Sequence, residues 1–247
     1  MIKVLYTLII LILLSACSDR DSKNEIKLST LIEADFTYTQ DLFNCSLNQN
    51  QSLISLETFF SKNISKYKTL AEEESLGLSI FFPDNNSNIT NFIISIISNK
   101  NPGGIKKFID AINEDSFDKV ASCSFAIYQN RGINFQEKST KKTDLYTNVE
   151  ILNCNFNDGY NFGTFEISIN KFINNLRLIK LPYSMSYLED NSSNDGFIWI
   201  NYYYTDDYEK ILLENWIGNN NSMEIQNEFS ENATCIESNK YKSYRLI

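Results

Sequence analysis

The chain has 247 residues, with 22 Lys and Arg against 31 Asp and Glu, a formal net charge of -9 and no histidine. This acidic balance argues against a nucleic-acid partner, because phosphate binding depends on clustered Lys and Arg. Without histidine the chain cannot form a Ser-His-Asp or Cys-His hydrolase, a His-ligated haem or zinc site, or an imidazole pH switch.

The first segment in chain order, residues 1–16, has the pattern of a secretory signal peptide. Lys3 precedes an uncharged apolar run from Val4 to Leu14, and the small residues Ser15 and Ala16 follow. A basic residue, an apolar run and a small-residue cleavage site are typical of such peptides. The run is shorter than the roughly 20 apolar residues that a membrane-spanning helix needs. We therefore expect residues 1–16 to be removed during export.

The tetrapeptide Leu14-Ser15-Ala16-Cys17 resembles the lipobox of bacterial lipoproteins. The resemblance implies that a diacylglyceryl group is attached to Cys17 and that the chain is cut just before it. Two or more acyl chains hold a protein stably on a membrane, and the polar residues 17–33 would then be the tether. In Gram-negative lipoproteins, a residue such as Ser18 after the cysteine favours the outer membrane. The resemblance thus implies a cell-envelope protein whose membrane contact is the lipid on Cys17.

The next segment predicts a β-α-β-β-α-β succession. Strands are expected near residues 37–45, 78–82, 89–97 and 122–128, where apolar residues alternate or form short runs between turn signals. Apolar residues at three- and four-residue steps predict helices near 53–64 and 105–112. We assign residues 34–129 to a first repeat and residues 130–144, which show no periodicity, to a linker.

Residues 145–247 repeat this succession. The pairs Asn44-Cys45 and Asn153-Cys154 match, as do Ala121-Ser122-Cys123 and Ala233-Thr234-Cys235. A period of more than 100 residues indicates a duplicated domain rather than a solenoid. Strands are expected near 147–154, 184–188, 197–204 and 235–246, and helices near 162–176 and 208–216.

This order of elements is that of the ferredoxin-like motif. The predicted fold class is α+β, with two tandem ferredoxin-like (βαββαβ) repeats that pack sheet to sheet as an intramolecular α+β barrel. The mature chain is similar in architecture to the dimeric α+β barrel families. That similarity carries over no catalytic residue, because the chain contains no motif specific to one family.

Apart from Cys17, the four cysteines are expected to form disulfides, the usual state in an exported protein. In a ferredoxin-like sheet the first and last strands are neighbours, which favours Cys45 with Cys123 and Cys154 with Cys235. A four-cysteine zinc site is the alternative, but the chain has no C-x-x-C pair. A catalytic thiol is disfavoured because no activating group is identifiable.

Six residues form the candidate pocket. Asp41 and Glu150 occupy equivalent places in the two repeats and could point between the two sheets. The other candidates are Asn44, Asn153, Trp199 and Tyr203. The competing interpretation is that these are outward-facing polar residues of strands. The sequence assigns no catalytic residue, metal ligand or cofactor.

The prediction for function is a lipid-anchored, monomeric envelope protein that acts as a binding or structural module, with a small apolar ligand or another envelope protein as partner. The alternative is a cofactor-independent oxygenase-like enzyme of the α+β barrel type, acting on a small aromatic or apolar substrate. A cavity of at least roughly 300 Å³ between the sheets, lined by Trp199 and the two Asn residues, favours the enzyme. An interior filled by side chains argues against it.

Overall fold

The computed structural model describes residues 36–84, 89–99, 102–124, 129–136, 145–179, 183–189, 196–205, 207–208, 210, 213–217 and 220–247. The predicted signal peptide (1–16), Cys17 and the tether (17–33) lie outside these residues. Within the described ranges, no helix is both long enough and apolar enough to cross a bilayer.

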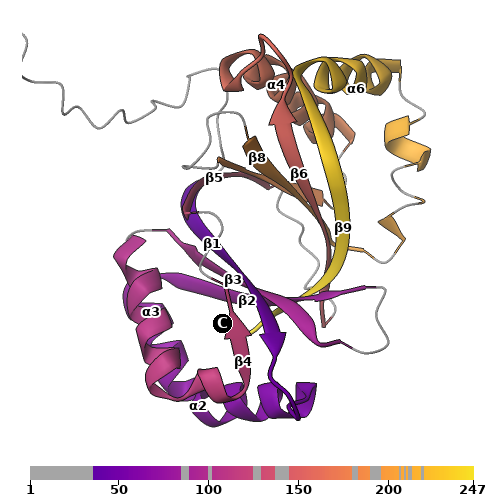
Figure 1. The fold of residues 1–247 in the computed structure, drawn as a ribbon. Helices are drawn as coiled ribbons and strands as arrows, with labels where there is room; N and C mark the ends of the chain where they lie inside the picture. The colour runs from indigo at the N-terminus through magenta and orange to yellow at the C-terminus, as the bar shows by residue number, and fades with distance from the viewer. Residues whose placement is uncertain are drawn as a thin grey trace, which may run out of the picture. The chain divides into compact units, whose positions relative to one another are not determined.

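The first repeat contains β1 (Phe36–Leu47), α2 (Leu53–Glu74), β2 (Leu76–Pro83), β3 (Asn91–Ser98), α3 (Pro102–Glu114) and β4 (Ala121–Cys123), with a short 3-10 turn at Phe117–Lys119 (Figure 1). Helix α2 begins at a capping box in which Ser52 and Ser55 bond each other's backbone N–H. It ends at Ser75, which adopts the left-handed conformation with φ 56°.

The second repeat contains β6 (Thr147–Phe156), α4 (Phe162–Ile179), β7 (Tyr183–Glu189), β8 (Gly196–Tyr203), α6 (Asn220–Asn232) and β9 (Ala233–Arg245). A π-helical turn at Leu213–Ile217 precedes α6. The strand order β4-β1-β3-β2 in the first repeat equals β9-β6-β8-β7 in the second. All pairs are antiparallel. The predicted pair of ferredoxin-like repeats is confirmed.

The two repeats join into a closed ring of strands. In the nine-stranded sheet β2 pairs with β9 and β5 (Gln129–Gln136) pairs with β7, while β1 pairs with both β3 and β5. The ring therefore runs β1-β3-β2-β9-β6-β8-β7-β5 and returns to β1, and β4 is attached to β1 outside it. Closure removes the free strand edges that an open sheet would present.

The predicted linker, 130–144, is partly wrong, because β5 occupies its first residues. Long strand β9 pairs with β6 and then also with β2. In the first repeat the equivalent strand is divided into β4, which pairs with β1, and β5, which pairs with β1 and β7. The β5 sequence is mostly polar, so its strand conformation comes from pairing on both sides rather than from local preference. Residues 137–144 lie outside the described residues.

The helix expected near 208–216 is also wrong in position. The second helix of this repeat is α6, and the π-helical turn at Leu213–Ile217 occupies the predicted place. Tyr208 and Trp216 suggested a helical spacing, whereas α6 is largely polar and has few apolar residues that would identify it. Packing against α4 stabilises this helix.

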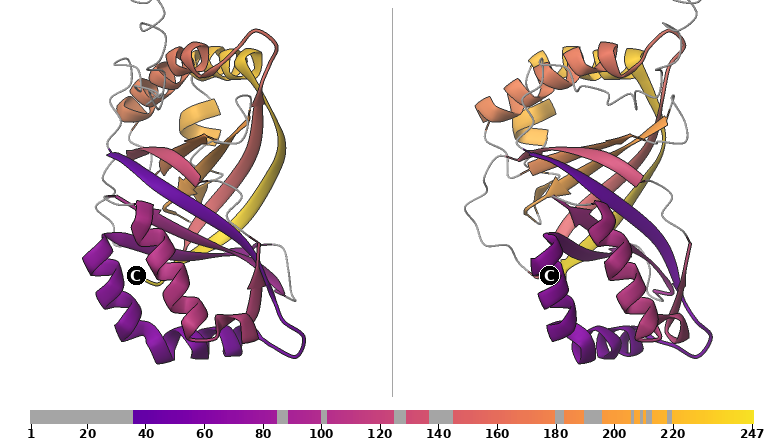
Figure 2. Two further views of the ribbon diagram at one scale, coloured as in Figure 1. Left: turned by 60° about the vertical axis from the view of Figure 1, so that its left-hand side comes forward. Right: turned by 90° about the vertical axis from the view of Figure 1, so that its left-hand side faces the viewer.

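Helices lie on the outer face of each repeat, and the inner face forms the centre of the ring (Figure 2). Helices α2 and α3 cover a core that includes Phe60, Tyr67 and Phe108. The inner faces of six strands form a second core: Tyr38, Leu42, Phe81, Ile93, Val149, Ile151, Leu188, Ile198 and Ile200. The ring interior is thus packed with side chains.

Candidate functional site

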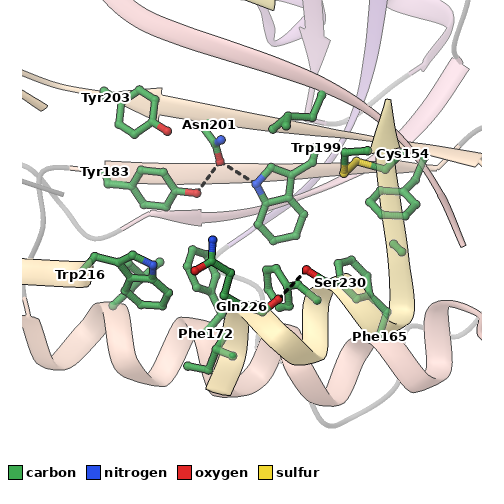
Figure 3. Close-up of a pocket in the computed structure, with 17 residues that line it drawn as sticks. Cys154, Phe165, Phe172, Tyr183, Trp199, Asn201, Tyr203, Trp216, Gln226 and Ser230 are labelled. Carbon is green, nitrogen blue, oxygen red and sulfur yellow. Dashed lines mark hydrogen bonds between the residues drawn. A yellow bond between two sulfur atoms is a disulfide. The ribbon is translucent and has the colours of Figure 1, made fainter. Parts of the chain in front are cut away.

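A pocket of about 450 Å³ lies between the strands of the second repeat and its helices. Its floor comes from β6, β8 and the start of β9, and its opposite wall from α4, α6 and the π-helical turn (Figure 3). Eight aromatic side chains line it: Phe165, Phe172, Tyr183, Phe197, Trp199, Tyr203, Trp216 and Phe229. The volume falls within the usual range of small-molecule sites.

The aromatic rings contact one another around the pocket. The Phe172 ring meets the Trp216 ring edge-on, with centroids 5.1 Å apart and an interplanar angle of 85°. The Trp199 ring on β8 contacts the Phe229 ring on α6, with centroids 5.5 Å apart. Edge-on and tilted pairs of this kind are favourable aromatic arrangements, so the rings support one another's orientation.

The polar wall of the pocket is centred on Asn201. Its Oδ1 accepts hydrogen bonds from Trp199 Nε1 and from the Tyr183 hydroxyl, each at 2.6 Å (Figure 3). Its Nδ2 donates to Glu150 Oε2 at 2.9 Å. The indole N–H can only donate and an ionised carboxylate can only accept, so both neighbours fix the same amide orientation.

Glu150 lies behind this wall and receives three hydrogen bonds. Besides Asn201, the Tyr203 hydroxyl donates to Oε2 at 3.1 Å and the Ser238 hydroxyl donates to Oε1 at 2.5 Å. Burial raises the pKa of the Tyr183 and Tyr203 hydroxyls well above the usual value, and the nearby Glu150 charge adds to this effect. Both tyrosines therefore remain protonated donors at neutral pH.

Three of the six predicted pocket residues belong to this site. Trp199 and Tyr203 line the cavity, and Glu150 holds its polar wall. Asn44 instead lines a separate hollow of about 340 Å³ with Pro83 and Tyr241. Asn153 is half-buried on β6 at odd spacing from Glu150, so strand alternation places it on the opposite face. The predicted convergence of all six residues between two sheets is therefore wrong.

The strand register of the first repeat places apolar or small residues where the second has its polar wall. Asp41 pairs with Ile96 where Glu150 pairs with Asn201, and Thr39 pairs with Ser98 where Asn148 pairs with Tyr203. In the same register Ile94 corresponds to Trp199, because their partners Phe43 and Leu152 are equivalent. The fold therefore does not itself require Trp199, Asn201 or Tyr203.

Asp41, the equivalent of Glu150 in the first repeat, has no asparagine opposite it, because Ile96 stands where the second repeat has Asn201. Asp41 is buried, and its Oδ1 has no hydrogen-bond partner. Burial raises the pKa of this carboxyl to about 6. Asp41 thus lies in a position equivalent to that of Glu150 but outside any comparable hydrogen-bond network.

Several residues of the site were not predicted from the sequence. Asn201 could have been found, because it lies between Trp199 and Tyr203 on the same face of one strand. Gln226 and Phe229 could not, because the expected helix was placed before α6. In Figure 3 the Gln226 side chain extends from α6 toward the strand wall.

Polar side chains are also buried in the interior of the ring. Gln40 Nε2 donates to Ser95 Oγ at 2.8 Å, and the Tyr38 hydroxyl donates to Ser186 Oγ. Burial raises the pKa of Tyr202 to about 12. These polar groups bond one another within a packed core, which argues against a substrate cavity between the sheets.

A further hollow of about 690 Å³ lies between α2 and the end of β9. It contains none of the predicted site residues. Lys242 and Asp84 at its edge pair with each other, with Nζ and Oδ1 3.1 Å apart. The aromatic pocket of the second repeat is therefore the better candidate.

Both expected disulfides are present. Cys45 bonds Cys123 with an S–S distance of 2.00 Å, and Cys154 bonds Cys235 at 2.06 Å. The second bridge also lines the aromatic pocket. Among the residues that the structure describes, no three His, Cys, Asp or Glu side chains gather as a possible metal site.

No family model and no curated protein matches the chain. A chlorite dismutase variant from Candidatus Nitrospira defluvii is similar in fold, with a TM-score of 0.55 and 8% identity over 87% of this chain and 94% of that one. A protein assigned as a monooxygenase from Fusobacterium nucleatum has a TM-score of 0.53 and 9% identity, over 86% of this chain and 94% of that one. Another protein assigned as a monooxygenase, from Lactobacillus acidophilus NCFM, has a TM-score of 0.50 and 12% identity, over 85% of this chain and 95% of that one. At these identities the likeness establishes the shared fold.

Proposed function

We propose that this chain is a lipid-anchored cell-envelope protein that binds a small, largely apolar ligand in the aromatic pocket of its second repeat. The observation that carries the binding proposal is the difference between the repeats. Trp199, Asn201 and Tyr203 stand where the first repeat has Ile94, Ile96 and Ser98. Residues that the fold does not require, gathered around a cavity of about 450 Å³, are the signature of a binding site.

The envelope location rests on the N-terminal sequence and on the cysteines. Leu14-Ser15-Ala16-Cys17 follows an apolar run as a lipobox does, and disulfides persist in oxidising, extracytoplasmic compartments. The outer membrane is the proposed site, as Ser18 suggests. A Cys17→Ala variant should lose labelled-palmitate incorporation and leave the membrane fraction; a variant that stays there without the label would contradict the anchor.

Ligand binding can be followed through tryptophan fluorescence. The chain has only two tryptophans, Trp199 and Trp216, and both line the pocket. N-phenyl-1-naphthylamine, a neutral apolar probe, should quench them on binding.

Two helix variants locate the binding. Ser230 lines the pocket and Asn227, on the same helix, does not. Ser230→Phe fills the cavity and should weaken probe binding about tenfold or more, by roughly 1.4 kcal/mol, whereas Asn227→Phe should not. Equal binding by both variants, or no binding by the wild type, would refute the proposal.

The second candidate is cofactor-independent oxygenation of an aromatic substrate in the same pocket. It is favoured by the fold shared with proteins assigned as monooxygenases and by the pairing of Trp199 with Asn201. Stoichiometric oxygen consumption with a bound aromatic compound, lost in Asn201→Leu, would favour it over simple binding.

A further inference from the structure

Most donor hydrogens of the polar wall point to other residues of the wall and not toward a ligand. The Trp199 N–H and the Tyr183 hydroxyl donate to Asn201, and Asn201 donates onward. The Tyr203 hydroxyl donates directly to Glu150. Each of these donors, apart from the second N–H of Asn201, is committed within the wall. The groups still available to a ligand there are mainly acceptor lone pairs of the two tyrosine oxygens, of which the Tyr183 oxygen is also approached by the Trp199 N–H.

The negative charge behind this wall is not neutralised at close range. No Lys or Arg nitrogen in the described part of the chain lies within 4.0 Å of the Glu150 carboxylate. Lys240 is its register partner on β9, but the Lys240 Nζ lies over the Tyr208 ring, 5.9 Å from the centroid. Hydrogen bonds from neutral donors hold the charge in place, and its field extends toward the pocket.

The aromatic lining has the same electrostatic preference. Ring faces carry partial negative charge, and tryptophan and tyrosine attract cations placed over them, most strongly where water is excluded. Trp199, Tyr183 and Tyr203 are all buried, and Trp216 lies across the cavity. An anion would instead meet oxygen lone pairs and be repelled by the Glu150 charge behind the wall, and few donors would replace its lost hydration.

Building on the proposed binding function, we propose that the ligand of this pocket is an organic cation, an amine or quaternary ammonium compound with an apolar or aromatic body. Its body lies against the rings of Phe165, Phe172 and Phe229, which line the cavity and contact one another. Its charged end lies against the wall of Tyr183, Asn201 and Tyr203, with Glu150 as the balancing charge. The Gln226 amide, which extends into the cavity from α6, can bond a further polar group of the ligand.

The test compares three probes of similar size by tryptophan quenching: phenyltrimethylammonium, its neutral isostere tert-butylbenzene, and benzoate. The cation should bind about tenfold or more tightly than the neutral isostere, and benzoate should bind most weakly. In Glu150→Gln, which keeps the side-chain shape, the advantage of the cation should fall to about threefold or less. Binding of tert-butylbenzene should change less than binding of the cation, and Asn227→Phe, which lies outside the pocket lining, should keep the full preference for the cation.

The outcomes separate this inference from the function on which it rests. If the neutral isostere binds as tightly as the cation, or if Glu150→Gln keeps the full preference, the charge assignment is overturned while apolar binding stands. If N-phenyl-1-naphthylamine and all three probes fail to quench wild-type fluorescence, the binding function and the inference both fall.

Discussion

Asn201 is the residue on which the polar wall depends, since it accepts from Trp199 and Tyr183 and donates to Glu150. Asn201→Leu would leave two buried donors unpaired and remove one of three hydrogen bonds to the Glu150 carboxylate. Unsatisfied buried groups are costly, so the free energy of unfolding should fall by about 2 to 4 kcal/mol. Urea denaturation measures this loss.

The matched control for that variant is Asn155→Leu, because Asn155 is an exposed strand residue of the same repeat. Its free energy of unfolding should stay within about 0.5 kcal/mol of wild type. A similar loss in both variants would mean that the leucine itself, and not the broken network, destabilises the sheet.

Asp41 predicts a pH dependence of stability. Its pKa is about 6 in the folded chain and about 3.9 when unfolded, so the folded state binds the proton more tightly. The stabilising contribution is therefore full below about pH 4 and is lost as the pH rises through about 6. The free energy of unfolding of Asp41→Asn should exceed that of the wild type by up to about 3 kcal/mol near pH 7.5 and should equal it near pH 3.5. Urea unfolding across this range checks it, and a pH-independent difference would contradict it.

At the scale of elements, the disulfides join equivalent strands but have different surroundings. Each closes a loop of similar length, with sequence separations of 78 and 81. Replacing either pair by serines should lower the free energy of unfolding by about 2 to 5 kcal/mol. Because Cys154 and Cys235 line the pocket, only their removal should also weaken probe binding.

Each serine variant serves as the control for the other, because both should lose stability and only one should lose probe affinity. Chemical denaturation measures the stability of both, and tryptophan quenching by N-phenyl-1-naphthylamine measures the pocket. Equal affinity for the probe in both variants would show that the bridge of the second repeat does not shape the cavity.

Regular amphipathic segments could be predicted from sequence, and segments shaped by distant partners could not. The apolar stripe of α2 and the alternation in β1 carry local signals. Helix α6 and strand β5 are polar, and only their neighbours α4, β1 and β7 make them regular. The site followed the same division. Trp199 and Tyr203 were identified on one strand, while Phe229 and Gln226 came from the unpredicted helix.

The duplication was visible from the equivalent cysteines, and the closure of the ring was not. Fold class could be inferred from the order of elements, because βαββαβ repeated in one chain has few compact solutions. Which strand bridges the repeats depends on pairing between residues far apart in sequence. That information is absent from the local pattern of residues 129–136.

Closure of the ring makes β5 essential to the whole molecule. Ile133 pairs with Thr37 on one side and Tyr187 on the other. In a strand paired on both sides, every backbone N–H faces a neighbouring strand, and proline removes that donor. Ile133→Pro should therefore lower the free energy of unfolding by about 3 kcal/mol or more. Ile133→Ala shortens the side chain but keeps the N–H, and should be clearly less destabilising. Thermal and urea unfolding measure the stability of both variants. Equal stability would mean that residues 130–136 act as part of the linker, residues 130–144, expected from the sequence.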